Sequence, residues 1–150
     1  MIIEEAKASQ AKEISDLIKE SVLFAHTGIY PEDKVENVLT MYKPEGVEGY
    51  MKEGKYFVAI EGGKIIGCIL IIKEEMSSLY VLPEHIHKGI GTKLSQKAEA
   101  DIKENNYPHV WIWSSLTAVD FYKSRGYKQE SDITDKKGNT WYIGMKKVFG

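Results

Sequence analysis

The segment from Ser78 to Gln96 constrains the fold of this chain more than any other stretch. It starts with an apolar run at 79–81 that is typical of a strand, and Pro83, which lacks an N–H group, must end that strand. A short turn with two glycines follows, and apolar residues then recur every fourth position from Ile90, which predicts a helix. The free amides at the start of such a helix form an anion site, and phosphate is the obvious guest.

Composition and charge limit the classes of protein to which the chain can belong. Its 150 residues fit one domain, residues 1–150, and its formal net charge of −2 gives no basic field for nucleic acid or an anionic membrane. No apolar stretch approaches the length of about 18 residues that a membrane span requires, and the acidic amino end does not resemble a signal peptide. The single cysteine, Cys68, leaves no internal disulfide. We therefore expect a cytoplasmic protein without membrane or nucleic-acid partners.

Periodicity predicts alternating strands and helices along the rest of the chain. Their order, β-α-α-β-β-β-α-β-α-β-β, predicts an α+β fold, a largely antiparallel central sheet with helices on both faces. The region 43–54 is predicted as turns or a short helix, and Ser9 and Thr117 are predicted helix N-caps. The expected strands are 1–5, 56–60, 65–72, 76–81, 110–113, 127–133 and 140–145, with hairpin turns at 61–64 and 135–139, and the expected helices are 9–23, 31–42, 90–105 and 117–123.

The run V-x-P-E-x-x-x-K-G-I-G-T-x-L, which begins at Val81, closely resembles the acetyl-CoA pyrophosphate loop of the GCN5-related N-acetyltransferase (GNAT) superfamily. Gly89 and Gly91 match that loop, whereas Ile86 takes a Gln/Arg position and His87 a position that is often glycine. The resemblance implies a GNAT-like three-layer sandwich with acetyl-CoA as cosubstrate. It also implies two sets of cofactor-binding residues: Leu79, Tyr80 and Val81 on the strand, and His87, Lys88, Gly89, Ile90, Gly91 and Thr92 in the loop.

His87 has three interpretations that the sequence leaves open. If its position demands a positive φ, histidine carries a cost that glycine avoids. A protonated imidazole could instead add positive charge towards phosphate. The simplest interpretation is an exposed histidine in a turn.

A second motif, from Thr117 to Tyr127, resembles the other hallmark of the superfamily, which commonly ends in Phe-Tyr and then Gly-Phe or Gly-Tyr. By this resemblance Tyr122 is the general acid that protonates the departing CoA thiolate; otherwise its ring only packs beneath the sheet. A phenol with a reference pKa of about 10 is protonated at neutral pH and suits that role. Ser115 stands where the family often has an asparagine that contacts the cofactor.

The general base is weakly indicated by the sequence. Glu74 and Glu75 precede the central strand and could face the acceptor, although two exposed turn carboxylates are the favoured interpretation. His26 lies in the loop region that usually shapes the acceptor pocket, and its ordinary pKa suits a base, but a capping or surface role fits it equally well. His85, His87 and His109 show no metal-binding spacing, so we predict no metal site.

The leading hypothesis is an acetyl-CoA-dependent N-acetyltransferase that modifies a primary amine of a small molecule, such as a polyamine, by direct attack on the thioester. A peptide N-terminus or lysine is the alternative acceptor. A catalytically silent CoA-binding regulatory module is a second hypothesis, which Ile86, His87 and Ser115 favour and Tyr122 opposes. A nucleotide-phosphate binder is a third, which the second motif disfavours. Pairing through the last strands would allow a homodimer.

Overall fold

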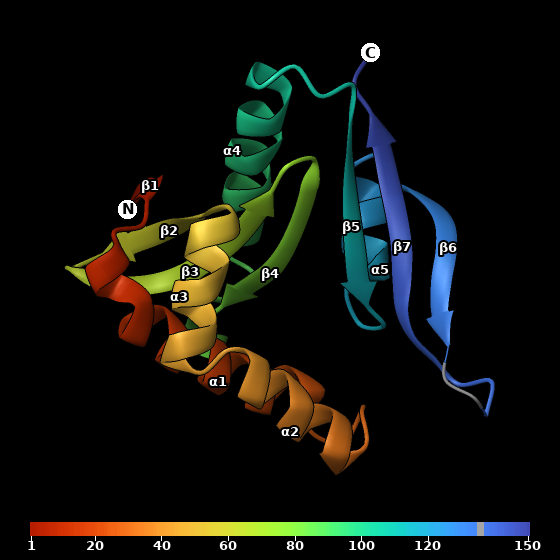
Figure 1. The fold of residues 1–150 in the computed structure, drawn as a ribbon, viewed down its shortest axis with the longest axis horizontal. Helices are drawn as coiled ribbons and strands as arrows, with labels where there is room; N and C mark the ends of the chain where they lie inside the picture. The colour runs from red at the N-terminus through yellow and green to blue at the C-terminus, as the bar shows by residue number, and fades with distance from the viewer. Residues whose placement is uncertain (135–136) are drawn as a thin grey trace.

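Seven strands form one sheet in the computed structural model, which describes residues 1–134 and 137–150 (Figure 1). The order of the strands in the sheet is β1-β2-β3-β4-β5-β7-β6. Neighbouring strands are antiparallel, with the exception of β4 and β5, which are parallel. The strands are β1 (Ile2–Glu5), β2 (Lys55–Glu61), β3 (Lys64–Ile72), β4 (Glu75–Val81), β5 (His109–Ser115), β6 (Lys128–Thr134) and β7 (Thr140–Val148).

Helices cover both faces of this sheet, as the sequence predicted. Helices α1 and α3 pack on one face, and α4 packs on the opposite face against β2, β3 and β4 (Figure 1). The mixed, mostly antiparallel three-layer fold is therefore confirmed. The helices are α1 (Ala11–His26), α2 (Glu32–Met41), α3 (Pro44–Glu53), α4 (Ile90–Glu104) and α5 (Val119–Ser124), with short 3-10 helices η1 (Ala8–Gln10) and η2 (Pro83–His85).

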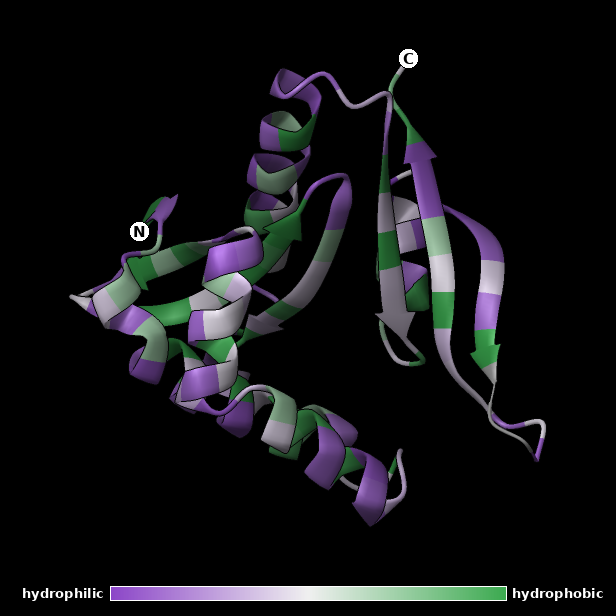
Figure 2. Ribbon diagram, viewed as in Figure 1, coloured by the Kyte–Doolittle hydropathy of each residue, from purple (hydrophilic) through white to green (hydrophobic). Residues whose placement is uncertain are grey.

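The core follows the apolar periodicity of the sequence. On α4 the residues that recur every fourth position from Ile90 to Ile102 are buried, as is the face of α1 that contains Ile14 and Ile18. Strand β3 is buried along most of its length because helices cover both of its faces, and Figure 2 shows it as a mainly apolar ribbon. Burial of these apolar side chains stabilises the two helix layers against the sheet.

The hairpin between β2 and β3 forms where two glycines interrupt the apolar runs. Glu61 pairs with Lys64, and Gly62 and Gly63 both have positive φ angles of 59° and 76°. A two-residue turn with two positive φ angles matches the twist of the flanking strands, and glycine adopts it without strain.

The parallel pairing of β4 with β5 is short. Within the described residues, two pairs make up this ladder, both at the start of β4: Glu75 with Trp111, and Met76 with Ile112. Beyond these pairs the two strands diverge. In Figure 1 the β4 and β5 ribbons separate as they run away from the C-terminal end of α4 and towards the side of α1 and α2. The sheet therefore consists of two halves, β1–β4 and β5–β7, which are joined at one end.

Several predicted boundaries are wrong. Helix α1 extends to His26 rather than ending near Leu23, whereas residues 44–53 form the short helix, α3, that was one of the two alternatives for that region. Ser9 does not cap α1, because the chain enters that helix through the 3-10 turn η1. Thr117 does not cap α5, which begins at Val119 after Ala118. The final hairpin is confirmed by the pairing of β6 with β7, whereas the predicted turn at 135–139 lies partly outside the described residues.

Candidate active site

A cavity of about 580 Å³ lies at the end of the sheet where β4 and β5 diverge. Its walls come from α1, the end of β4, the turn before α4, the first turn of α4, and the segment from β5 into α5. Most of the predicted site residues line it: His26, Leu79, Tyr80, Val81, His87, Gly89, Ile90, Gly91, Thr92, Ser115 and Tyr122. Lys88 and Glu75 do not.

Strand β4 contributes an edge that β5 does not pair. A bulge interrupts the ladder with β3, because Leu70 pairs with Ser77 but Cys68 pairs with Tyr80. The residue within this bulge, Ser78, has a positive φ of 54°, and a bulge of this kind bends the strand. Residues 79–81 have no partner in the described register of β5, and they line the cavity. The unpaired edge of β4, which contains the predicted cofactor-binding residues 79–81, therefore faces the cavity.

The N-terminus of α4 forms the second wall. Gly89 is the N-cap, with a φ of 80° and no side-chain capping bond, and Lys93 N donates to Gly89 O over 3.1 Å. The amides of Ile90, Gly91 and Thr92 precede that bond in the first turn, where the helix itself offers them no partner. The helix dipole adds positive potential at this end, so the wall suits a phosphate group.

His87 adopts the strained backbone that one interpretation of the sequence anticipated. Its φ is 66°, and its side chain is exposed at the rim of the cavity. Ile86 also lines the cavity, with 36% of its surface exposed, and it offers no side-chain donor in place of the usual Gln or Arg. With no Gln or Arg side chain at position 86, the donors that this wall offers to an anion are mainly its backbone amides.

Tyr122 lies on α5 and reaches the same cavity from the other half of the sheet. Its side chain is 3% exposed, and its ring packs edge-to-face against Tyr127 with centroids 5.5 Å apart. Burial raises the pKa of the Tyr122 phenol well above its ordinary value. The phenol is therefore fully protonated at neutral pH and can serve as a proton donor.

Ser115 and Thr117 line the cavity between β5 and α5. Their hydroxyl oxygens, Oγ and Oγ1, lie 3.3 Å apart, and either can donate. The Ser115 hydroxyl thus occupies the position predicted for a cofactor contact, and it shares a hydrogen bond with a neighbouring residue.

The two base candidates occupy different places. His26, in the last turn of α1, lines the cavity, and burial lowers the pKa of its imidazole. Glu75 lies at the joined end of the sheet, where it pairs with Trp111, and it does not line the cavity. Burial, and next the neighbouring charge of Glu74, raise the pKa of Glu75. The structure brings His26, but not Glu75, to the cavity.

Sequence reasoning missed several lining residues: Ser21, Ala25, His85, Ala118 and Phe121. Ser21 donates through Oγ to Val81 O over 3.1 Å and thereby joins α1 to the end of β4. A serine on the buried face of an amphipathic helix was the available signal. His85 has a buried Nδ1 without a hydrogen-bond partner, 3.7 Å from Glu61 Oε2, and no local pattern indicated it.

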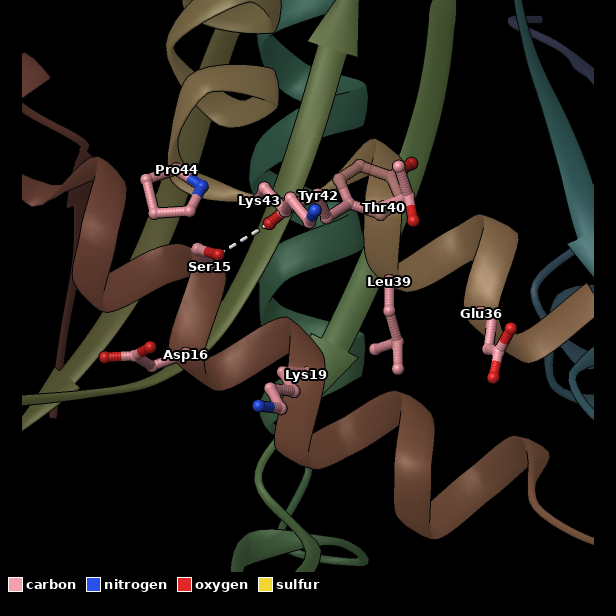
Figure 3. Close-up of a pocket in the computed structure, with 9 residues that line it drawn as sticks. All are labelled: Ser15, Asp16, Lys19, Glu36, Leu39, Thr40, Tyr42, Lys43 and Pro44. Atoms are coloured by element: carbon pink, nitrogen blue, oxygen red, sulfur yellow. Dashed lines mark hydrogen bonds between the residues drawn. The ribbon is translucent and has the colours of Figure 1, made fainter. Parts of the chain in front are cut away.

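A second hollow of about 440 Å³ lies between α1, α2 and the start of α3 (Figure 3). Ser15 Oγ donates across it to Tyr42 O over 2.6 Å, and charged side chains such as Asp16, Lys19 and Glu36 surround it. It contains none of the residues of the two sequence motifs, so the cavity beside β4 is the candidate active site.

Within residues 1–134 and 137–150, no group of three or more metal-binding side chains is placed to hold an ion. Helices in the same part of the chain are too short or too polar to cross a bilayer.

Comparisons with known proteins agree with this geometry. Residues 27–149 match the family model described as the acetyltransferase (GNAT) domain. An uncharacterized N-acetyltransferase of Chlorobaculum tepidum is 33% identical over 111 residues, which cover 71% of this chain and 63% of that relative. The chain thus spans less than two thirds of that relative's length.

Two solved structures share the fold at low sequence identity. A GCN5-related N-acetyltransferase of Rhodopseudomonas palustris superposes with a TM-score of 0.89 at 17% identity, over 99% of this chain and 95% of that one. The PaiA N-acetyltransferase of Thermoplasma acidophilum, in complex with coenzyme A, gives a TM-score of 0.81 at 24% identity, over 99% and 100%. The match to the family model over residues 27–149 and the shared fold show that this chain belongs to the GNAT family of N-acetyltransferase domains.

Proposed function

We propose that this protein transfers the acetyl group of acetyl-CoA to a primary amine of a small molecule. The observation that carries the proposal is that three elements line one cavity: the amides at the start of α4, the unpaired edge of β4, and the Tyr122 side chain. They suit, in turn, a diphosphate, a thioester carbonyl and a departing thiolate.

The α4 wall is the proposed seat of the pyrophosphate. His87, Gly89, Ile90, Gly91 and Thr92 line it, and their backbone amides, together with the helix dipole, suit a bound phosphate group. Lys88 remains a predicted contact through its backbone, outside the cavity wall. Support also comes from the Thermoplasma acidophilum relative, whose structure contains coenzyme A.

The edge of β4 is the proposed donor to the developing oxyanion. When the amine nitrogen attacks the carbonyl carbon, negative charge develops on the carbonyl oxygen, and an N–H group of residues 79–81 can stabilise it. Because the bulge and the divergence fix this edge before substrate binds, no reorganisation is needed during the reaction.

Tyr122 and His26 are the proposed acid and base. An acceptor amine with a pKa near 10 arrives as an ammonium and must lose a proton before it attacks. His26, kept neutral by burial, can accept that proton directly or through water. As the C–S bond breaks, the sulfur takes the proton of the Tyr122 hydroxyl, which is later restored from solvent.

The small acceptor is proposed by analogy with a structural relative, because the cavity of about 580 Å³ must also hold acetyl-CoA and its volume does not select the acceptor. One structural relative is named an aminoglycoside 6'-N-acetyltransferase complexed with coenzyme A, at a TM-score of 0.72 and 19% identity. A peptide N-terminus or lysine is the alternative acceptor, and the experiment must distinguish it from a small-molecule amine.

Two measurements test the function. At about 100 times its dissociation constant, acetyl-CoA should stabilise the fold by about 2.7 kcal/mol, which a thermal melt detects. Thiol release is then followed over a panel of polyamines, other small amines and peptides with a free N-terminus or lysine.

The outcomes separate the hypotheses. Stabilisation by ATP but not by acetyl-CoA would overturn both the enzyme and the silent CoA-binding module. Stabilisation by acetyl-CoA without thiol release for any amine would favour the silent module, to which the departures at Ile86, His87 and Ser115 point. Thiol release with peptides and with no small amine would show that the acceptor is a peptide and would overturn the proposed small-molecule acceptor.

A further inference from the structure

The two halves of the sheet are joined by different contacts at their two ends. At the joined end, β4 pairs with β5, and the Tyr127 hydroxyl lies 3.9 Å from the sulfur of Met76. At the open end, where the cavity lies, the strands have diverged and no β-ladder of the described residues connects them. A side-chain bridge at that end would therefore control how far apart the halves lie.

Tyr30 forms such a bridge. It lies in the loop between α1 and α2, which belongs to the β1–β4 half, and its side chain is buried. Its hydroxyl donates to Trp141 O in β7 over 2.9 Å, and it accepts from Leu116 N over 2.9 Å. One oxygen atom thus joins the α1–α2 loop to both β7 and the segment that follows β5.

The bonded amide belongs to the segment that carries the proposed acid. Leu116 lies between Ser115 and Thr117, both of which line the cavity, and it precedes α5, the helix that contains Tyr122. Fixing the Leu116 amide therefore restricts the path along which the chain enters α5. The α4 amides that form the proposed diphosphate wall belong to the β1–β4 half, and the hydrogen bonds of the Tyr30 hydroxyl go instead to Trp141 and Leu116 of the other half.

The Tyr30 ring also supports the proposed base. Its centroid lies 4.9 Å from that of His26 and 6.2 Å from that of Tyr142, with which it is stacked. The ring would remain in place if only the hydroxyl were removed, so the contributions of ring and hydroxyl can be separated.

We propose that the Tyr30 hydroxyl is a positioning group that holds the two halves at their working separation and aligns the Tyr122 segment with the β4 edge. The inference rests on the proposed acetyl transfer. Because it acts on the segment before Tyr122 and not on the diphosphate wall, loss of the hydroxyl should lower kcat much more than it weakens CoA binding, to which Ser115 beside Leu116 is a predicted contributor. A group that only stabilised the fold would not produce this split.

The test is Tyr30→Phe, compared with Tyr107→Phe, which changes a partly buried tyrosine on the chain between α4 and β5, away from the cavity. We expect kcat of Tyr30→Phe to fall about tenfold, the scale of a modest misplacement of a reacting group, with the dissociation constant of CoA within about twofold of the original value. Hydrogen exchange at the Leu116 amide should accelerate in this variant and stay unchanged in Tyr107→Phe.

Hydrogen exchange at the Leu116 amide tests the Tyr30 bridge independently of any catalytic activity. In the unaltered protein the Leu116 amide should be protected, and rapid exchange there would overturn the bridge even if Tyr30→Phe failed to fold. If no acetyl transfer is found but Leu116 exchange responds to Tyr30→Phe, the proposed function fails and the bridge stands. An unchanged kcat, or equal losses in kcat and CoA affinity, would overturn the positioning role.

Discussion

At the scale of single residues, burial changes the pKa of Tyr122 and of His26 in opposite directions. Desolvation raises the pKa of the phenol and lowers that of the imidazole, because both shifts favour the neutral form. Tyr122 therefore keeps its proton at neutral pH, and His26 is free to accept one. The same physical effect leaves both side chains in the protonation states that the proposed acid and base require, although it makes the phenol a weaker acid and the imidazole a weaker base.

Replacement of Tyr122 by Phe removes the proposed acid and retains the ring. We expect kcat to fall by about 10²-fold, the scale of a positioned general acid, while CoA still stabilises the fold. Thiol-release kinetics measure this, and Phe121→Leu provides a control that alters packing beside the hydroxyl without removing it. Turnover that stays unchanged would remove Tyr122 from the mechanism.

His26 predicts a pH dependence of stability. Its pKa is lowered in the folded state, so below the ordinary value of 6.5 the unfolded chain binds more protons than the folded one. The contribution of His26 is therefore present above pH 6.5 and is lost as the pH falls below it. His26→Gln should show a shallower loss of unfolding free energy between pH 6.5 and 5 in urea titrations.

The matched control is His87→Gln, which changes an exposed histidine of the turn. The slope of unfolding free energy against pH should be shallower for His26→Gln than for this variant. Parallel curves for His26→Gln and the original protein would show that burial of His26 does not couple to proton binding.

At the scale of elements, the bulge in β4 decides where the sheet opens. Ser78 has a φ of 54°, which non-glycine residues adopt only when their surroundings hold them there. Its Oγ donates to the Tyr42 hydroxyl at the end of α2, and its carbonyl accepts from the Cys68 thiol over 3.4 Å. The first helix layer thus holds the bulge in the position that frees the strand edge.

Substitutions at Ser78 separate its hydrogen bond from its backbone. Ser78→Ala loses the bond to Tyr42 and keeps the left-handed strain, so we expect a loss of about 1 kcal/mol of unfolding free energy. Ser78→Gly loses the same bond but relieves the strain, and it should be closer to the original stability. Urea denaturation measures both, with Ser77→Ala as the neighbouring control. Equal losses for Ala and Gly would mean that the backbone at Ser78 stores no strain.

At the scale of the whole molecule, α4 connects the two halves on the face opposite α1. Glu99 of α4 is buried and lies 3.2 Å from Lys147 Nζ of β7 and 3.8 Å from the Arg125 guanidinium after α5. One carboxylate therefore balances two cations from the far half. Together with Tyr30 on the other face, it restrains the second half relative to the first.

Glu99→Gln removes this shared charge and leaves two cations partly buried without it. We expect a loss of about 2 kcal/mol of unfolding free energy, less than for a fully buried pair because the Lys147 side chain is 30% exposed. Asp16→Asn, in the exposed pair with Lys12, should cost about 0.5 kcal/mol or less. Similar losses in the two variants under urea denaturation would contradict a structural role for Glu99.

The sequence by itself determined the parts of the protein that depend on local patterns. The glycine turn, the apolar face of α4 and the Phe-Tyr motif around Tyr122 are short-range signals, and they predicted the fold class, the family and most of the residues in the cavity. The single domain, the cytoplasmic location and the homodimer stay predictions.

Only the tertiary structure decided how these parts meet. The run 76–81 contains neither glycine nor proline, so nothing local indicated a bulge at Ser78, where the side chain bonds to Tyr42, 36 residues away in the sequence. Glu75 and His26 were both base candidates in the sequence, and only the tertiary structure placed Glu75, at the start of β4, outside the cavity and His26, at the end of α1, in its wall. The Tyr30 hydroxyl bonds to the carbonyl of Trp141, 111 residues further along the chain. Such a contact forms only when the chain folds and closes a long loop, so no sequence periodicity or motif spacing indicates it.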